Sequence, residues 1–493
     1  MKAIHILFLL CNFSFLSAQQ VSVLVRDQTS GSPIPYATIQ FEEGKGLITN
    51  EEGYFSFNPS IVATDSITIS CMGYVERTLP TKAFETQQAA IDLQRNTITL
   101  NDVSVYANAP NIDSIMTRVR RNIATNYLEI PIEQKLFHRT SNYVDFDRLL
   151  GTLERSTLMS KQQLAAANEE LEAFSRQFTS EPIRQYTEFL ADRFWSDSSK
   201  VKITKATYLV DLDKTIDTDE LQKKGQEIIL KHLDSSKTYK VKTGLFKVED
   251  SLKIDVEDFE EAEEDKDNWD VSYFRGASNE LFKDFRFKED SFLSKIINPK
   301  YYKYVLEDEL ASYNGKALFV VRFEPRKRKA KYSGKLYIND DDYAIVRTDY
   351  SYAEGRQGTK VNLKLLLGVR YHENLHNGTL FFRKDEDLAS YVPHYAKSET
   401  GQYVYVKRPF KFIENTKEKN KLKCEFMMEM NFNEKDELIV LESNALDIPA
   451  FKAFEEQEKF KVESLQRYDP SIWQEYQVLS PVDDMKTFGL GED

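Results

Sequence analysis

The sequence predicts an α+β protein in which an N-terminal β-sandwich precedes a larger domain built on a curved antiparallel sheet with several helices. Three observations support this prediction. Short alternating runs fill residues 21–106, helical patterns follow from Ile112, and a strand-and-turn meander occupies Lys316–Lys384. At 493 residues the chain is long enough for two or three domains, each able to bury a core.

The first residues are typical of a secretory signal. Met1–Ala18 contains a basic residue, an apolar run at Ile4–Leu10 and the small pair Ser17 and Ala18 before the expected cut. Cys11 follows a leucine, where a lipoprotein site needs a small residue, so we predict no lipid anchor. We expect an exported protein that resides in the periplasm, at the outer membrane or outside the cell.

The charge disfavours a nucleic-acid partner, and the hydropathy excludes a membrane-spanning helix after the signal. The formal net charge is −13, which disfavours nucleic acid, because that partner needs a concentrated basic face. After the signal, no run reaches the roughly 18 apolar residues that a membrane helix needs. Only Cys71 and Cys424 remain in the mature chain, and such a distant pair is no disulfide framework.

Two charged runs are interpreted as solvated loops. Arg326–Lys331 follows a proline and precedes a Ser-Gly turn, so we expect a hairpin loop, with contact to an anionic lipid or glycan as the alternative. Residues 255–270 are strongly acidic and are expected to form a mobile loop. Cation binding is the alternative there, although the run lacks calcium-loop spacing with a central glycine.

Residues 19–107 are predicted to form the sandwich. Runs such as VSVLVRD and SITIS are separated by turn signals such as SGSPIP. Gly53 lies where a tight turn between strands needs a positive φ, and Phe55 and Phe57 then alternate inward. Gly73 before Tyr74 is expected to form a bulge.

The motifs of this stretch are Val25–Asp27, Pro33–Ile39, Thr49–Phe55 and Ile69–Tyr74. Together they resemble the carboxypeptidase-D regulatory-like domain, and Leu100–Tyr106 resembles its closing strand. The resemblance implies a transthyretin-like sandwich, a module that precedes many outer-membrane receptors and secreted proteins of Bacteroidota. It implies little about activity, because the module accompanies enzymes, receptors and uncharacterised proteins alike.

Residues 111–493 are predicted to form the larger α+β domain. Apolar spacing predicts helices at Ile112–Tyr127, Lys161–Phe178, Asp219–Leu233 and Ala450–Tyr468, while Phe137–Tyr143 and most of residues 301–442 are expected to form strands. The opening helix, the FHRTSNY strand and the KALFVVRFEP meander resemble an uncharacterised region that follows the regulatory domain in some Bacteroidota proteins. The alternation of strands and turns in this region is also similar to the half-barrels of lipoprotein carriers. This second resemblance implies a sheet that binds an acyl chain.

One string resembles a zinc-peptidase motif. His372-Glu373-Asn-Leu-His376 fits the HExxH pattern, in which two histidines one helical turn apart bind zinc and the glutamate acts as general base. The chemistry needs a helix, but Lys360–Tyr371 alternates with period two. Continuing that phase places both histidines on the polar face of a strand that ends in an Asn377-Gly378 hairpin turn. Two histidines spaced by four strand residues, roughly 13 Å, cannot share one zinc ion.

Other catalytic signatures are missing from the sequence. It has no Gly-x-Ser-x-Gly elbow, phosphate loop, dinucleotide fingerprint or paired cysteines for a metal. The 79 acidic residues offer too many carboxylate pairs for spacing to select a glycosidase pair. We therefore predict no catalytic, cofactor-binding or metal-binding residues.

The preferred interpretation is an exported, non-catalytic accessory protein that binds an outer-membrane protein, a glycan or a lipid. One alternative is a zinc-dependent peptidase that uses His372, Glu373 and His376. The other is a periplasmic lipid or lipoprotein carrier, which requires an apolar cavity in the concave sheet.

Overall fold

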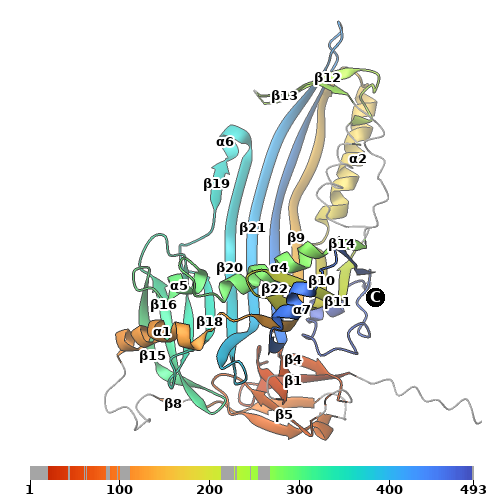
Figure 1. Cartoon of the computed structure of the whole chain (residues 1–493). Helices are drawn as coiled ribbons and strands as arrows, with labels where there is room; N and C mark the ends of the chain where they lie inside the picture. The colour runs from red at the N-terminus through yellow and green to blue at the C-terminus, as the bar shows by residue number, and fades with distance from the viewer. Residues whose placement is uncertain are drawn as a thin grey trace, which may run out of the picture. The chain divides into compact units, whose positions relative to one another are not determined.

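A computed structural model describes residues 20–42, 45–59, 62, 64–84, 89–96, 98–99, 111–211, 227, 230–244, 246–253 and 267–490 (Figure 1). The chain divides into two compact units. The sandwich unit comprises residues 1–104, 309–318 and 468–487, and the sheet unit comprises residues 105–308, 319–467 and 488–493. The two units contain mainly antiparallel sheets with helices, which confirms the predicted α+β class.

Four sequence predictions lie wholly or largely outside the described residues. These are the signal at Met1–Ala18, the closing strand at Leu100–Tyr106, most of the helix at Asp219–Leu233 and most of the acidic run at residues 255–270. The last residues of the acidic run, Asn268–Asp270, form the short strand β14.

The sandwich unit contains two small sheets. In the first, β1 lies between an antiparallel β4 and a parallel β7, and the second has the order β3-β2-β5-β6. Alternating side chains such as Val23, Phe55 and Ile67 are fully buried, as the predicted period-two pattern requires. The strands are β1 (Val21–Asp27), β2 (Thr38–Glu42), β3 (Lys45–Ile48), β4 (Tyr54–Phe57), β5 (Ser66–Ser70), β6 (Arg77–Pro80) and β7 (Ala89–Leu93), with a 3-10 turn η1 (Thr81–Phe84).

Gly53 makes the turn into β4 with a φ of 78°, as predicted. A Cβ at this position would lie 2.8 Å from the carbonyl oxygen of Val25 and 2.9 Å from the Cβ of Pro33. The glycine is therefore needed both for its left-handed backbone and for the close approach of β1.

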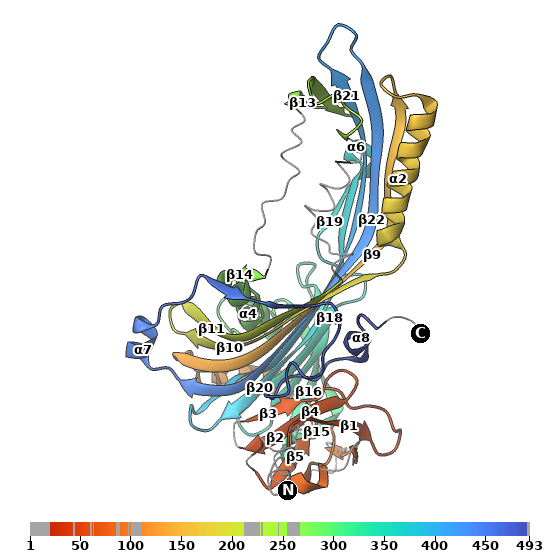
Figure 2. The same cartoon turned by 90° about the vertical axis from the view of Figure 1, so that its right-hand side faces the viewer.

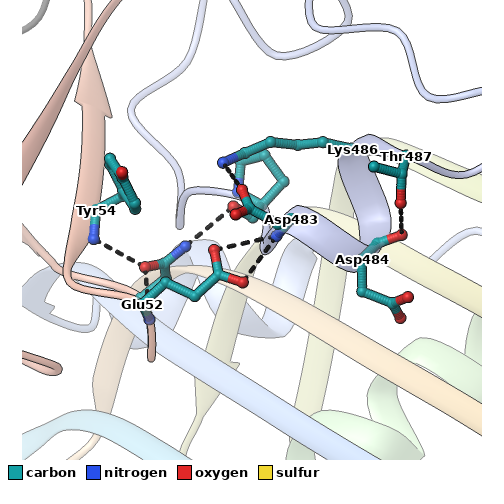
Figure 3. Close-up of polar contacts among 8 residues, drawn as sticks. Glu52, Tyr54, Asp483, Asp484, Lys486 and Thr487 are labelled. Atoms are coloured by element: carbon teal, nitrogen blue, oxygen red, sulfur yellow. Dashed lines mark hydrogen bonds and ion pairs between the residues drawn. The ribbon is translucent and has the colours of Figure 1, made fainter. Parts of the chain in front are cut away.

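A segment distant in sequence completes the sandwich unit. The amide of Asn50 donates to the carbonyl of Pro481 at 3.0 Å, and the Glu52 carboxylate accepts the backbone N–H of Asp483 at 2.9 Å (Figure 3). Asp483 begins the short helix α8 (Asp483–Lys486), and its carboxylate pairs with Lys486. The strand β8 (Ile98–Thr99) pairs with Glu309 and Leu310 of β15 in the same unit.

The sheet unit is built on one large sheet with the order β24-β11-β10-β9-β22-β21-β20-β18-β17-β16-β15, and its long strands curve (Figure 2). Its strands are β9 (Ile132–Ser156), β10 (Ile183–Trp195), β11 (Ser199–Val210), β15 (Tyr302–Tyr313), β16 (Lys316–Pro325), β17 (Tyr332–Asn339), β18 (Ile345–Tyr352), β20 (Val369–Asp385), β21 (Ser390–Glu414), β22 (Lys421–Ala445) and β24 (Glu463–Leu465). Shorter strands β12 (Thr238–Thr243), β13 (Phe246–Lys253) and β19 (Lys360–Leu363) pair with its members, and β14 pairs with β23 (Lys459–Lys461). The basic run between β16 and β17 is an exposed loop, as predicted.

The helices predicted at Ile112–Tyr127 and Lys161–Phe178 are present, and each begins directly after a capping residue. Asn111 caps α1 (Ile112–Asn126) by accepting the N–H of Asp113. Ser160 and Gln163 form a reciprocal capping box at the start of α2 (Lys161–Thr179). Helix α2 lies along the outer part of β9, with buried Leu171 in the same apolar cluster as Leu153 (Figure 2).

The predicted helix at Ala450–Tyr468 is wrong. Helix α7 (Ile448–Ala453) is a single short turn, and the chain then forms β23 and β24. Phe460 and Val462 alternate with charged residues, so this stretch can pair as a strand. It does so with β14 and β11, and tertiary pairing overrides the helix-favouring composition. The remaining helices are α4 (Val271–Asp284), α5 (Phe292–Ile296) and α6 (Lys364–Leu367).

No described helix is long and apolar enough to cross a bilayer. Cys71 and Cys424 are both buried, and no disulfide joins them. Burial raises the pKa of the Cys424 thiol to about 12, which makes it a poor nucleophile.

Candidate functional site

The HENLH string lies in strand β20, as its period-two context predicts. The predicted Asn377-Gly378 turn is wrong, because β20 continues to Asp385 and both residues pair with β18 and β21. Gly378 instead allows the Tyr350 ring to pack closely against β20, because a Cβ at this position would lie 2.6 Å from Cζ of Tyr350. The turn occurs earlier, where α6 interrupts the predicted strand at Lys364–Leu367 and Gly368 takes a φ of 66°.

A bulge separates the two histidines of this string. His372 pairs with Tyr403 and His376 pairs with Thr400, so Asn374 is an extra residue in β20. Because Tyr403 and Thr400 are three residues apart, the histidines point to opposite faces of the sheet, not to one polar face as predicted. Among the described residues, no group of three or more metal-ligating side chains converges.

The side chains of the string have structural partners. The Glu373 carboxylate accepts the N–H of Thr359 at 2.5 Å, and this hydrogen bond lowers its pKa. His376 is not at an exposed hairpin tip: its Nδ1 is 2.8 Å from the Tyr332 hydroxyl, and burial lowers its pKa. A glutamate held by a loop and a histidine held by a tyrosine give no peptidase geometry.

The sheet unit contains a cavity of about 430 Å³, which is the candidate functional site. That volume is within the range of roughly 300–1,000 Å³ typical of small-molecule sites. We call it the arginine pocket, and it lies between the C-terminal end of α1, the start of β9, the end of β10, the end of α4 and the β20–β21 turn region. Its lining residues are Ile123, Ala124, Tyr127, Leu128, Glu129, Ile130, Ile132, Gln134, Arg193, Trp195, Phe282, Phe285, Arg286, Phe287, Lys288, Phe382, Tyr391, Val392 and Pro393.

One wall of the arginine pocket is aromatic. The Tyr127 ring lies 4.5 Å from Phe287 and 4.9 Å from Phe382, centroid to centroid, and Phe285 lies 5.0 Å from Phe382. The Tyr127 hydroxyl donates to the backbone carbonyl of Ile345 at 2.7 Å, so its polar atom is already satisfied. This wall therefore offers an apolar surface to a ligand.

The arginine pocket is also lined by a buried cation, Arg193. Arg193 is 3% exposed and lies over the Phe282 ring, with its guanidinium carbon 4.0 Å from the centroid. Its Nη1 donates to Gln134 Oε1 at 3.0 Å and its Nε donates to Asn279 Oδ1 at 3.3 Å. Burial and the neighbouring Arg286 lower the pKa of Arg193 to about 9, so it remains charged at neutral pH.

The partners of Arg193 are neutral, which is unusual for a buried charge. Gln134 directly faces Arg193 across the β9–β10 pair, and its amide nitrogen is buried without a hydrogen-bond partner. The nearby Arg286 stacks over Trp195 at 5.5 Å and has no carboxylate partner among the described residues. Lys288 at the same pocket pairs with Glu129 at 3.2 Å.

The arginine pocket thus combines an aromatic wall with two arginines and an unused amide donor. An anion placed there would receive charge-assisted hydrogen bonds from Arg193 and a neutral one from Gln134. An apolar body attached to that anion would pack on Phe285 and Phe382. The arrangement suits binding and provides no nucleophile with an adjacent base.

The sequence prediction named none of these residues. Arg193 and Gln134 are 59 positions apart and meet only through strand pairing. The available signal was weak: RFW at the end of one strand and FKDFRFK after a helix place arginines beside aromatics. That pattern alone does not distinguish a binding site from an ordinary amphipathic surface.

Residues 24–105 match the family model of the CarboxypepD_reg-like domain. This stretch of the chain is therefore a carboxypeptidase regulatory-like domain, which confirms the resemblance of its motifs. No curated protein matches the chain.

Proposed function

We propose that this protein is an exported, non-catalytic binding protein whose sheet unit holds an anionic amphiphile in the arginine pocket. The proposal follows from one observation: among the described residues, the buried cation of Arg193 has only neutral partners, and it lines an aromatic cavity. A carboxylate or similar anionic head group would pair with the Arg193 guanidinium, and an acyl or aromatic body would fill the remainder of the arginine pocket. The regulatory-like domain is compatible with such a binding role.

A direct test compares two ligands that differ only in the head group. Purified full-length protein is stripped of bound lipid and titrated with a long-chain carboxylate and with the alcohol of the same chain length. We expect the carboxylate to bind at least roughly tenfold more tightly, because hydrogen bonds to charged groups contribute more than neutral ones. Arg193→Met should abolish this preference while leaving binding of the alcohol nearly unchanged.

A matched control separates the pocket from general charge effects. Arg148→Met removes an arginine from the same sheet, but its side chain is 59% exposed. This variant should keep the wild-type preference for the carboxylate. Equal affinity of wild-type protein for carboxylate and alcohol would reject the proposal, and native mass spectrometry of protein purified without stripping would reveal any ligand retained from the cell.

Export is the second part of the proposal, and Met1–Ala18 supports it. We expect the mature protein to begin at Gln19 and to fractionate with the periplasm, the outer membrane or the medium. N-terminal sequencing of the protein from its native host tests this. An intact Met1 in a cytosolic fraction would contradict it.

A further inference from the structure

The end of the β19–β20 hairpin has side chains that the pocket does not use. Helix α6 forms this end (Figure 1), and its Leu365 and Leu366 are 105% and 75% exposed. Leu363 and Val361 before it are 40% and 37% exposed. We call Val361–Leu366 the leucine tip. Scattered apolar residues are common on protein surfaces, but here four large exposed ones fall within one six-residue segment.

Basic residues flank the leucine tip in the sequence. Between Gly355 and His372 the sequence contains Arg356, Lys360, Lys364 and Arg370 and no acidic residue. Lys364 lies over the Tyr405 ring at 4.2 Å and Arg370 over the Tyr403 ring at 5.2 Å. None of the four forms an ion pair with a described residue, although the chain as a whole carries a net charge of −13.

The size of the patch favours one kind of partner. A stable protein–protein interface takes roughly 20–30 residues from each side, many more than the leucine tip provides. A bilayer surface needs only a few inserted apolar side chains together with cations at the level of the head groups. Exposed leucines flanked by unpaired lysines fit this requirement.

We propose that the leucine tip docks the protein on an anionic lipid bilayer. Leu365 and Leu366 enter the boundary between head groups and acyl chains, and Lys360 and Lys364 contact anionic head groups. This site is distinct from the arginine pocket, so the inference does not depend on the proposed ligand.

The test uses the full-length chain and vesicles of phosphatidylcholine with or without phosphatidylglycerol. We expect binding to the vesicles that contain phosphatidylglycerol, and a loss of about tenfold or more for Leu365→Asp/Leu366→Asp. The matched control is Leu150→Asp/Leu490→Asp, which makes the same changes at leucines that are 42% and 57% exposed. The control should bind like wild type.

Charge and insertion are tested separately. Each of Lys360→Ala and Lys364→Ala should weaken binding about fivefold at low salt, and high salt should remove the difference. Leu366→Trp should show a blue-shifted emission when anionic vesicles are added, relative to the wild-type background. Circular dichroism confirms that each variant folds.

Three results would overturn the inference. They are equal binding of wild type to both vesicle types, equal loss in the tip and control variants, and an unshifted emission for Leu366→Trp. Sedimentation velocity addresses a second copy of the chain as the partner. Self-association that disappears in Leu365→Asp/Leu366→Asp, without vesicle binding by wild type, would assign the tip to a dimer instead.

Discussion

Two buried arginines on neighbouring strands have opposite surroundings. Arg139 of β9 forms an ion pair with Glu188 of β10, with Nη2 2.6 Å from Oε1 and both side chains at most 3% exposed. Arg193, further along β10, is equally buried but contacts the amides of Gln134 and Asn279. The fold therefore gives Arg139 a buried counter-ion and gives Arg193 only neutral partners among the described residues. This difference separates a structural arginine from the candidate binding residue of the proposed function.

The largest expected change in the free energy of unfolding is for a substitution in the Arg139–Glu188 ion pair. Arg139→Met leaves the Glu188 carboxylate buried without its cation, and the free energy of unfolding should fall by about 3–5 kcal/mol. Urea denaturation followed by far-UV circular dichroism measures this change. The double variant Arg139→Met/Glu188→Leu should recover most of the loss, and a loss below about 1 kcal/mol in the single variant would remove the contrast.

The same substitution at Arg193 should act in the opposite direction. Arg193→Met removes a desolvated cation with neutral partners, so the free energy of unfolding without ligand should rise by about 1 kcal/mol. The same urea titration measures it, with Arg148→Met as the exposed control. Destabilisation of more than about 2 kcal/mol would mean that Arg193 is as structural as Arg139.

A half-buried acid, Asp284, extends the comparison to pH. Burial, and then the nearby Glu280, raise the pKa of Asp284 from 3.8 to about 7. The unfolded state loses this proton first, so stability contributed by Asp284 is present below about pH 4 and is lost as pH rises through 7. Asp284→Asn should therefore stabilise the protein at pH 8 by roughly 1–2 kcal/mol, allowing for its partial exposure, and should have little effect at pH 4.

Unfolding of wild type and Asp284→Asn across pH 4–9 checks this sign. Asp197→Asn, at an exposed position, is the control and should follow the wild-type curve. A gain for Asp284→Asn that is the same at pH 4 and pH 8 would show that ionisation of Asp284 is not its cause.

The smallest effect is expected for the ion pair of the pocket. The Lys288 and Glu129 side chains are 55% and 51% exposed, so Lys288→Ala should change the free energy of unfolding by less than about 0.5 kcal/mol. Its effect on carboxylate affinity should also be much smaller than that of Arg193→Met. Isothermal titration calorimetry of both variants gives the ratio, and equal losses would move the main anion contact away from Arg193.

Local sequence signals predicted the elements that local contacts determine. The apolar spacing of Lys161–Phe178 predicted α2, and Gly53 makes a turn that needs a positive φ, so both elements were predicted from local sequence. The prediction that the HENLH string lies in a strand was correct, although α6 interrupts the period-two pattern of Lys360–Tyr371 from which it was made. The same reasoning missed the bulge at Asn374, because a single unpaired residue depends on the register of β21.

The candidate site depends on contacts that sequence spacing does not encode. Gln134 and Arg193 face one another because β9 and β10 pair in one register, and Phe382 reaches the same cavity from β20. The helix predicted at Ala450–Tyr468 failed for a related reason. Its residues become strands only when the edges of β11 and β14 are available to pair with them.

The contacts of Asn50 and Glu52 with Pro481 and Asp483 have a consequence for assembly. They join positions 431 residues apart in the chain, so these are contacts of very large sequence separation within a small unit. During synthesis the regulatory-like module emerges early, but its last hydrogen bonds form only after nearly all of the polypeptide has followed. Until residues 481–483 are available, Asn50 and Glu52 lack these particular hydrogen bonds, so the N-terminal module reaches its final set of contacts only as part of the nearly complete chain.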